Sequence, residues 1–69
     1  MADQRVVGKI ARVTGTIGPG RTGEVMLEVR GGSEAFNAYP ADPEESISRG
    51  SRVVVVEHHP PRTVIVSPV

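Results

Sequence analysis

Three glycines, an arginine and a threonine lie close together in the sequence GPGRTGEV, residues 18–25, and this composition is compatible with a loop that holds a phosphate. A P-loop, however, ends in Gly-Lys-Ser/Thr and leads into a helix, whose first N–H groups bind the phosphate. Neither feature follows here, and Val25 instead begins a strand pattern. We therefore predict a loop between the first two strands, with Pro19 and Gly20 as its turn residues and Gly23 at the start of the second strand.

The pairs His58-His59 and Glu44-Glu45 are the other candidates for chemistry. Adjacent residues of a strand point to opposite faces, so the two histidines cannot easily hold one metal ion, and the chain has no cysteine to complete a zinc site. The two glutamates fall in a polar loop, which lacks the burial typical of catalytic carboxylates. No serine lies in a GxSxG motif. We expect no catalytic, cofactor-binding or metal-binding residue, no small-molecule substrate, and hence no enzyme.

The charge balance argues against binding to nucleic acid. Eight basic and eight acidic side chains give a formal net charge of zero, whereas nucleic-acid binders usually carry a basic excess. The only aromatic residues are Phe36, which we expect to face inward, and Tyr39, which would be a single platform for base stacking. We therefore expect no nucleic-acid partner. An OB-fold domain that binds single-stranded nucleic acid stays the alternative function.

Five strands are predicted from the alternation of apolar residues and the abundance of valine. They cover residues 6–17 (with a bulge at Gly8 or Gly15), the stretch from Gly23 to a Gly31-Gly32 turn, and residues 33–39, 52–58 and 63–66. A chain of 69 residues with these strands fits one small barrel, in which closure removes the exposed sheet edges. The candidates are an OB-fold and an SH3-like barrel.

The long first strand and the connection Pro40–Gly50 favour the OB-fold. We predict an all-β, five-stranded OB-fold barrel with at most one helical turn between strands three and four. Ile47 is the only large apolar residue of that connection, and it is expected to close the base of the core. Residues 6–69 would form the domain and residues 1–5 a disordered tail. The longest aliphatic run, Val53–Val56, is far short of the roughly 20 residues that span a bilayer, so we expect no membrane insertion by this domain.

An ordered set of residues resembles the C-terminal soluble domain of the NfeD-like family. The set consists of Val7-Gly8-Lys9, Ala11, Val13, Ile17, Pro19, Gly23, Val25, Gly32, Phe36-Asn37-Ala38, Ile47-Ser48-Arg49-Gly50, Val53–Val56, Val64, Val66 and Pro68. Two loops depart from the family pattern: residues 30–33 form a fuller hairpin, and Pro60-Pro61 stands where a glycine is often found.

The resemblance implies an OB barrel that is appended to a membrane-anchored bacterial protein and works beside stomatin, prohibitin or flotillin-like membrane proteins. It supplies no catalytic residue. We therefore predict a non-catalytic protein-interaction module. Its expected contacts are the exposed, non-acidic positions near the second and third strands, Met26, Arg30 and Tyr39. A structural appendage that stabilises an oligomer is a third possibility.

Overall fold

Five strands make up the fold, and their positions agree with the sequence pattern to within a few residues, except in the first strand. The computed structural model describes residues 6–29 and 31–69; the predicted tail, residues 1–5, and Arg30 lie outside the described residues. The strands are β1 (Ile10–Gly15), β2 (Gly23–Val29), β3 (Gly32–Pro40), β4 (Arg52–His59) and β5 (Thr63–Pro68).

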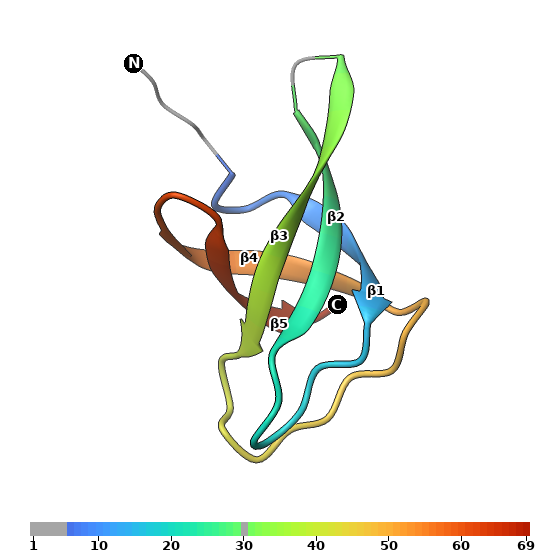
Figure 1. Cartoon of the computed structure of the whole chain (residues 1–69), viewed down its shortest axis with the longest axis vertical. Coiled ribbons are helices and arrows are strands. Elements are labelled where there is room, and N and C mark those ends of the chain that lie inside the picture. The colour runs from blue at the N-terminus through green and yellow to red at the C-terminus, as the bar shows by residue number, and fades with distance from the viewer. Residues whose placement is uncertain (1–5, 30) are drawn as a thin grey trace.

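The strands close into a barrel in the order β1-β2-β3-β5-β4, with β4 pairing back onto β1 (Figure 1). β3 and β5 are parallel, and the other pairs are antiparallel. This is the topology of an OB-fold, so the predicted fold class is confirmed. The described part of the chain contains no helix; between β3 and β4 it makes a turn, in which the Glu45 N–H donates to the Asp42 carbonyl at 3.0 Å.

The core fills the inside of this barrel, and all of its buried residues in the described part of the chain are apolar. Alternate residues of each strand point inward, and full burial of one valine or leucine side chain contributes about 1.5–3 kcal/mol. Phe36 is among the buried residues, as predicted. The core consists of Val6, Ala11, Val13, Ile17, Val25, Leu27, Phe36, Ala38, Ile47, Val53, Val55, Val64 and Val66.

The first strand is shorter than predicted, because the chain turns at both of its ends. Before β1, Gly8 adopts a φ of 93° inside a turn that is closed by the hydrogen bond from the Lys9 N–H to the Val6 carbonyl. At the other end, the register with β2 shifts between Val13 and Gly15, which places a bulge at one of the two glycines predicted to carry it. Beyond Gly15 the chain leaves β2 and pairs with the β3–β4 connection instead.

The two ends of the barrel differ in shape. At one end, which we call the loop end, the β1–β2 loop (residues 16–22) and the β3–β4 connection (residues 41–51) run together (Figure 1). At the other, the hairpin end, β2 and β3 extend past the rest of the barrel, because β1 pairs with β2 only as far as Met26 and β5 pairs with β3 only from Asn37. The β4–β5 turn, residues 60–62, also lies at the hairpin end.

Candidate functional site

A tight turn shapes the β1–β2 loop at the loop end. The Arg21 N–H donates to the Gly18 carbonyl at 3.2 Å, with Pro19 and Gly20 between them. Proline fixes φ near −65°, and Gly20 has a φ of 73°, so the pair matches the central positions of a type II turn. The sequence prediction that Pro19 and Gly20 are turn residues is thus confirmed. The turn holds Pro19 at the tip of the loop and directs Arg21 outward.

The loop is anchored to the barrel on both sides of this turn. Ile17 and Ile47 exchange two backbone hydrogen bonds, of 3.0 and 2.8 Å, and both side chains are buried. After the turn, Gly23 begins β2 where the chain passes close to itself: a Cβ at this position would lie 2.9 Å from the Gly15 carbonyl oxygen and from the Ile17 Cα. Only glycine fits there without a shift of the backbone. The loop is therefore held in one position.

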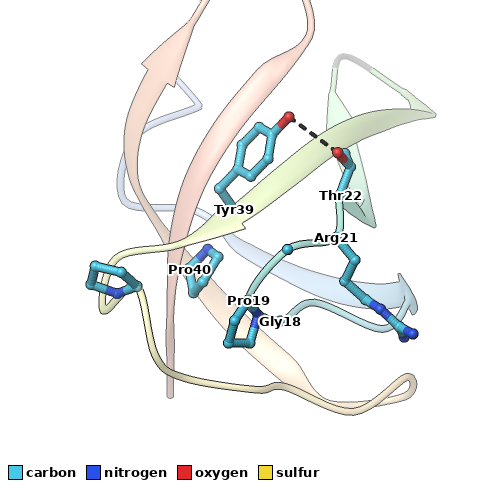
Figure 2. A pocket seen from close by; sticks show the side chains of 8 residues that line it. Gly18, Pro19, Arg21, Thr22, Tyr39 and Pro40 are labelled. Carbon is cyan, nitrogen blue, oxygen red and sulfur yellow. Dashed lines mark hydrogen bonds between the residues drawn. The ribbon is translucent and has the colours of Figure 1, made fainter.

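Tyr39 stands beside this loop and forms a groove with it. Its ring is exposed on the outer side of β3, and its hydroxyl lies 3.1 Å from the Thr22 Oγ1, which fixes the ring against the loop (Figure 2). The groove has a volume of about 350 Å³, which is at the lower limit of ordinary ligand sites. It is lined by Gly18, Pro19, Gly20, Arg21, Thr22, Tyr39, Pro40 and Pro43.

Met26, the second predicted contact residue, lies on the same outer side of the sheet but outside this groove. It is 38% exposed and stands directly opposite Ala35 of β3 and Arg12 of β1. Tyr39 follows Ala35 by four residues on the same face of β3, which places it about 13 Å farther along the strand. The structure thus brings Met26 and Tyr39 to one side of the barrel without contact. The third predicted residue, Arg30, lies outside the described residues.

Acidic side chains flank Met26 on this outer side. Glu24 and Glu28 of β2 share its face and are exposed. The Thr14 hydroxyl donates to the Glu24 Oε1 at 2.8 Å, which orients that carboxylate. Arg12 of β1 lies opposite Met26 on the same face, and Arg62 donates to the Ala35 carbonyl at 2.9 Å, so this side of the barrel carries charges of both signs.

The two adjacent histidines diverge, as expected for neighbours on a strand. A register shift between Val55 and Glu57 leaves Val56 and Glu57 both exposed and turns His58 inward, where its ring meets Phe36 edge-on at a centroid distance of 6.0 Å. His59 points outward, and its Nε2 lies 2.9 Å from the Glu57 Oε1. Within residues 6–29 and 31–69, no group of three or more His, Cys, Asp or Glu residues is placed to hold a metal ion.

The fold recurs in known proteins. A family model described as the NfeD C-terminal domain matches residues 10–67, which is most of the chain. The chain belongs to the NfeD C-terminal domain family. No curated protein matches the sequence.

Three solved structures show the same NfeD domain at 30% sequence identity. The soluble domain of a membrane protein implicated in regulation of membrane protease activity, from Corynebacterium glutamicum, aligns with a TM-score of 0.75 over 88% of this chain and 87% of that one. The soluble domain of the NfeD protein YuaF from Bacillus subtilis gives a TM-score of 0.74 over 88% and 70%. The C-terminal domain of stomatin operon partner protein 1510-C from Pyrococcus horikoshii gives 0.67 over 93% and 88%.

For this NfeD domain, the groove includes residues that the sequence analysis did not identify as functional. Thr22, Pro40 and Pro43 line it beside Tyr39. The pairing of Gly23 with Ala38 puts Thr22 next to Tyr39, so a prediction of strand register could have found that hydrogen bond.

No helix of the described residues has the length and apolar character needed to cross a bilayer.

Proposed function

We propose that this NfeD C-terminal domain is a non-catalytic protein-interaction module of a membrane-anchored protein, and that it binds a stomatin, prohibitin or flotillin-like membrane protein. The contact surface would be the outer side of β2 and β3, with Met26 at one end and Tyr39 at the other; Arg30 completes the predicted set. The observation that carries the proposal is Tyr39, an aromatic ring that is 42% exposed yet fixed by its hydrogen bond to Thr22.

A fixed, exposed aromatic ring is typical of a binding contact. Tyrosine offers a large contact area with few rotatable bonds, so little conformational entropy is lost when a partner covers it. The name of the Pyrococcus horikoshii relative, a stomatin operon partner protein, supports the choice of partner class. The name of the Corynebacterium glutamicum relative, the soluble domain of a membrane protein, supports a membrane-anchored parent.

Electrostatics on the same surface count against single-stranded nucleic acid. Proteins of that class combine stacking rings with a basic groove that follows the phosphate backbone. Here Glu24 and Glu28 lie on the same outer face as Tyr39. Arg12 beside them offsets part of their charge, so the face is mixed rather than basic, and the net charge of zero supplies no long-range attraction for phosphate.

A titration monitored by NMR tests both functions. The ¹⁵N-labelled domain is mixed with the soluble part of a stomatin-like protein from the same organism, and separately with a single-stranded oligonucleotide at roughly 50 mM salt, where electrostatic binding is strong. We expect the stomatin-like protein to shift a contiguous set of signals around Met26 and Tyr39. Weak affinity is sufficient, because two partners held in one membrane have a high effective concentration.

Variants define the surface. Met26→Ser and Tyr39→Ala should each weaken binding, whereas Arg49→Gln, an exposed position in the β3–β4 connection, should leave it unchanged. Saturable oligonucleotide shifts centred on Tyr39, together with no response to the stomatin-like protein, would replace the proposed function with nucleic-acid binding.

A further inference from the structure

Four of the eight residues that line the Tyr39 groove carry rings. Pro19 stands on the β1–β2 loop, Tyr39 and Pro40 lie at the end of β3, and Pro43 belongs to the β3–β4 connection (Figure 2). Proline has no N–H, so these walls present flat apolar surfaces with few donors. A ligand that fits such walls gains packing against rings and should itself have few N–H groups to bury, because an unpaired buried donor costs about 1–3 kcal/mol.

One hydroxyl proton remains available in the groove. The Thr22 and Tyr39 hydroxyls each carry one proton, and their mutual hydrogen bond uses only one of the two. The other can be donated to an acceptor of a ligand. A peptide carbonyl is such an acceptor, and a chain of prolines offers carbonyls without N–H groups.

The two rims of the groove carry opposite charge. Arg21 extends from the β1–β2 loop away from Tyr39, and among the described residues no carboxylate forms an ion pair with it (Figure 2). On the other side, Pro43 is flanked in the sequence by Asp42 and Glu44, both exposed. Charge complementarity therefore favours a ligand with a carboxylate at the Arg21 rim and none at the Pro43 rim.

We propose that the groove binds an extended, proline-rich segment in the polyproline II conformation, with a carboxylate beyond the prolines that pairs with Arg21. This proposal rests on the proposed function, because the protein partner would supply the proline-rich segment. Polyproline II is already populated in free proline-rich chains, so little entropy is lost when such a chain docks onto rings. Four prolines in this conformation span about 12 Å, and we expect the carboxylate that follows them to reach Arg21.

Two short peptides test the proposal on the 69-residue chain. One has four prolines followed by a glutamate, the other four prolines followed by a lysine, and both are acetylated and amidated to remove terminal charges. The ¹⁵N-labelled domain is titrated with each up to about 5 mM, enough to saturate most of a site with a Kd near 1 mM. We expect the glutamate peptide to shift the signals of Gly18, Gly20, Thr22 and Tyr39 and to bind at least about threefold more tightly than the lysine peptide.

A charge exchange gives the decisive comparison. In Arg21→Glu the preference should reverse, so that the lysine peptide binds more tightly than the glutamate peptide. Arg49→Glu makes the same charge change at an exposed position that does not line the groove, and it should preserve the original preference. Tyr39→Ala should weaken both peptides about tenfold or more, and Tyr39→Phe, which keeps the ring, should weaken them less.

Absence of saturable shifts with either peptide, or shifts located away from the groove, would overturn the proposal. So would an equal change of preference in Arg21→Glu and Arg49→Glu, because that result would mean unspecific attraction. Groove shifts produced by an oligonucleotide and by neither peptide would also overturn it, in favour of a nucleic-acid site. Peptide binding without any response to the stomatin-like protein would refute the proposed partner and leave the groove site standing.

Discussion

The loop end of the barrel is closed by two isoleucines, whereas the hairpin end is closed by a phenylalanine and a histidine. At the loop end, Ile17 and Ile47 pair through two backbone hydrogen bonds and bury both side chains. At the hairpin end, the His58 ring packs against Phe36, and its Nε2 is buried with no hydrogen-bond partner among the described residues. Among the described residues the loop end is thus satisfied, with no buried side-chain polar atom left without a partner, and the hairpin end includes one such atom, which costs stability.

This difference bears on where binding takes place. The groove lies at the satisfied end, where the Ile17–Ile47 pair, the Gly18–Arg21 turn and the Thr22–Tyr39 hydrogen bond fix its walls. A surface that is already ordered loses less entropy when a partner binds. We therefore expect a large loss of stability from substitutions that open the loop end. A substitution that removes the unpaired nitrogen at the hairpin end should instead increase stability.

The largest effect is expected for Ile47→Asp. An unpaired carboxylate in this apolar site would cost several kcal/mol, and a domain of this size has only about 3–5 kcal/mol to lose. The variant should be unfolded at room temperature, as measured by circular dichroism and by the collapse of NMR signal dispersion.

Glu45→Ala is the matched control for Ile47→Asp, because Glu45 lies two residues away in the same connection. Its stability should change by no more than about 0.5 kcal/mol. A folded Ile47→Asp variant with near-normal stability would show that the β3–β4 connection does not seal the barrel.

The second-largest effect is expected for Phe36→Ala, which should lower the free energy of unfolding by about 3–5 kcal/mol. The change removes the largest side chain of the hairpin end and leaves a cavity beside His58. Tyr39 provides the comparison, because it is the other aromatic residue of the same strand and faces outward. Tyr39→Ala should cost less than about 1.5 kcal/mol, mainly through the hydrogen bond to Thr22. Phe36→Ala should therefore be largely unfolded without urea, whereas Tyr39→Ala should show a complete urea-unfolding transition; equal transitions would contradict the inward orientation of Phe36.

The orientations of Phe36 and Tyr39 could be predicted from the sequence, and so could most of the fold. Alternation in Val25–Val29 and in Phe36–Ala38 determines which residues point inward, and the isolated Ile47 in a polar connection indicates a plug. The end of the first strand could not be predicted, because it depends on pairing between Ile17 and Ile47, which lie far apart in the sequence. Alternation along a continuous pattern does not show where a strand exchanges its partner.

The candidate site was predictable only in part, for the same reason. Tyr39 stood out as an exposed aromatic residue, but the groove also needs Pro43 and the Gly18–Arg21 turn, which the barrel topology brings beside it. The orientation of His58 was equally hidden. Strict alternation from Val53 and Val55 places Glu57 inward, and the register shift after Val55 puts His58 there instead.

The smallest predicted effect concerns this histidine, and it has the opposite sign. His58→Phe keeps an aromatic ring against Phe36 but removes the buried nitrogen that has no hydrogen-bond partner. Because a buried unsatisfied group costs about 1–3 kcal/mol, the variant should be more stable by about 1 kcal/mol, after allowance for the slightly larger ring. The measurement is urea unfolding at neutral pH, with His59→Phe as control: His59 is exposed and its contact with Glu57 contributes little, so that variant should change stability by no more than about 0.5 kcal/mol. A loss of stability in His58→Phe would mean that the imidazole nitrogen is satisfied by water, and that the two ends of the barrel are sealed equally well.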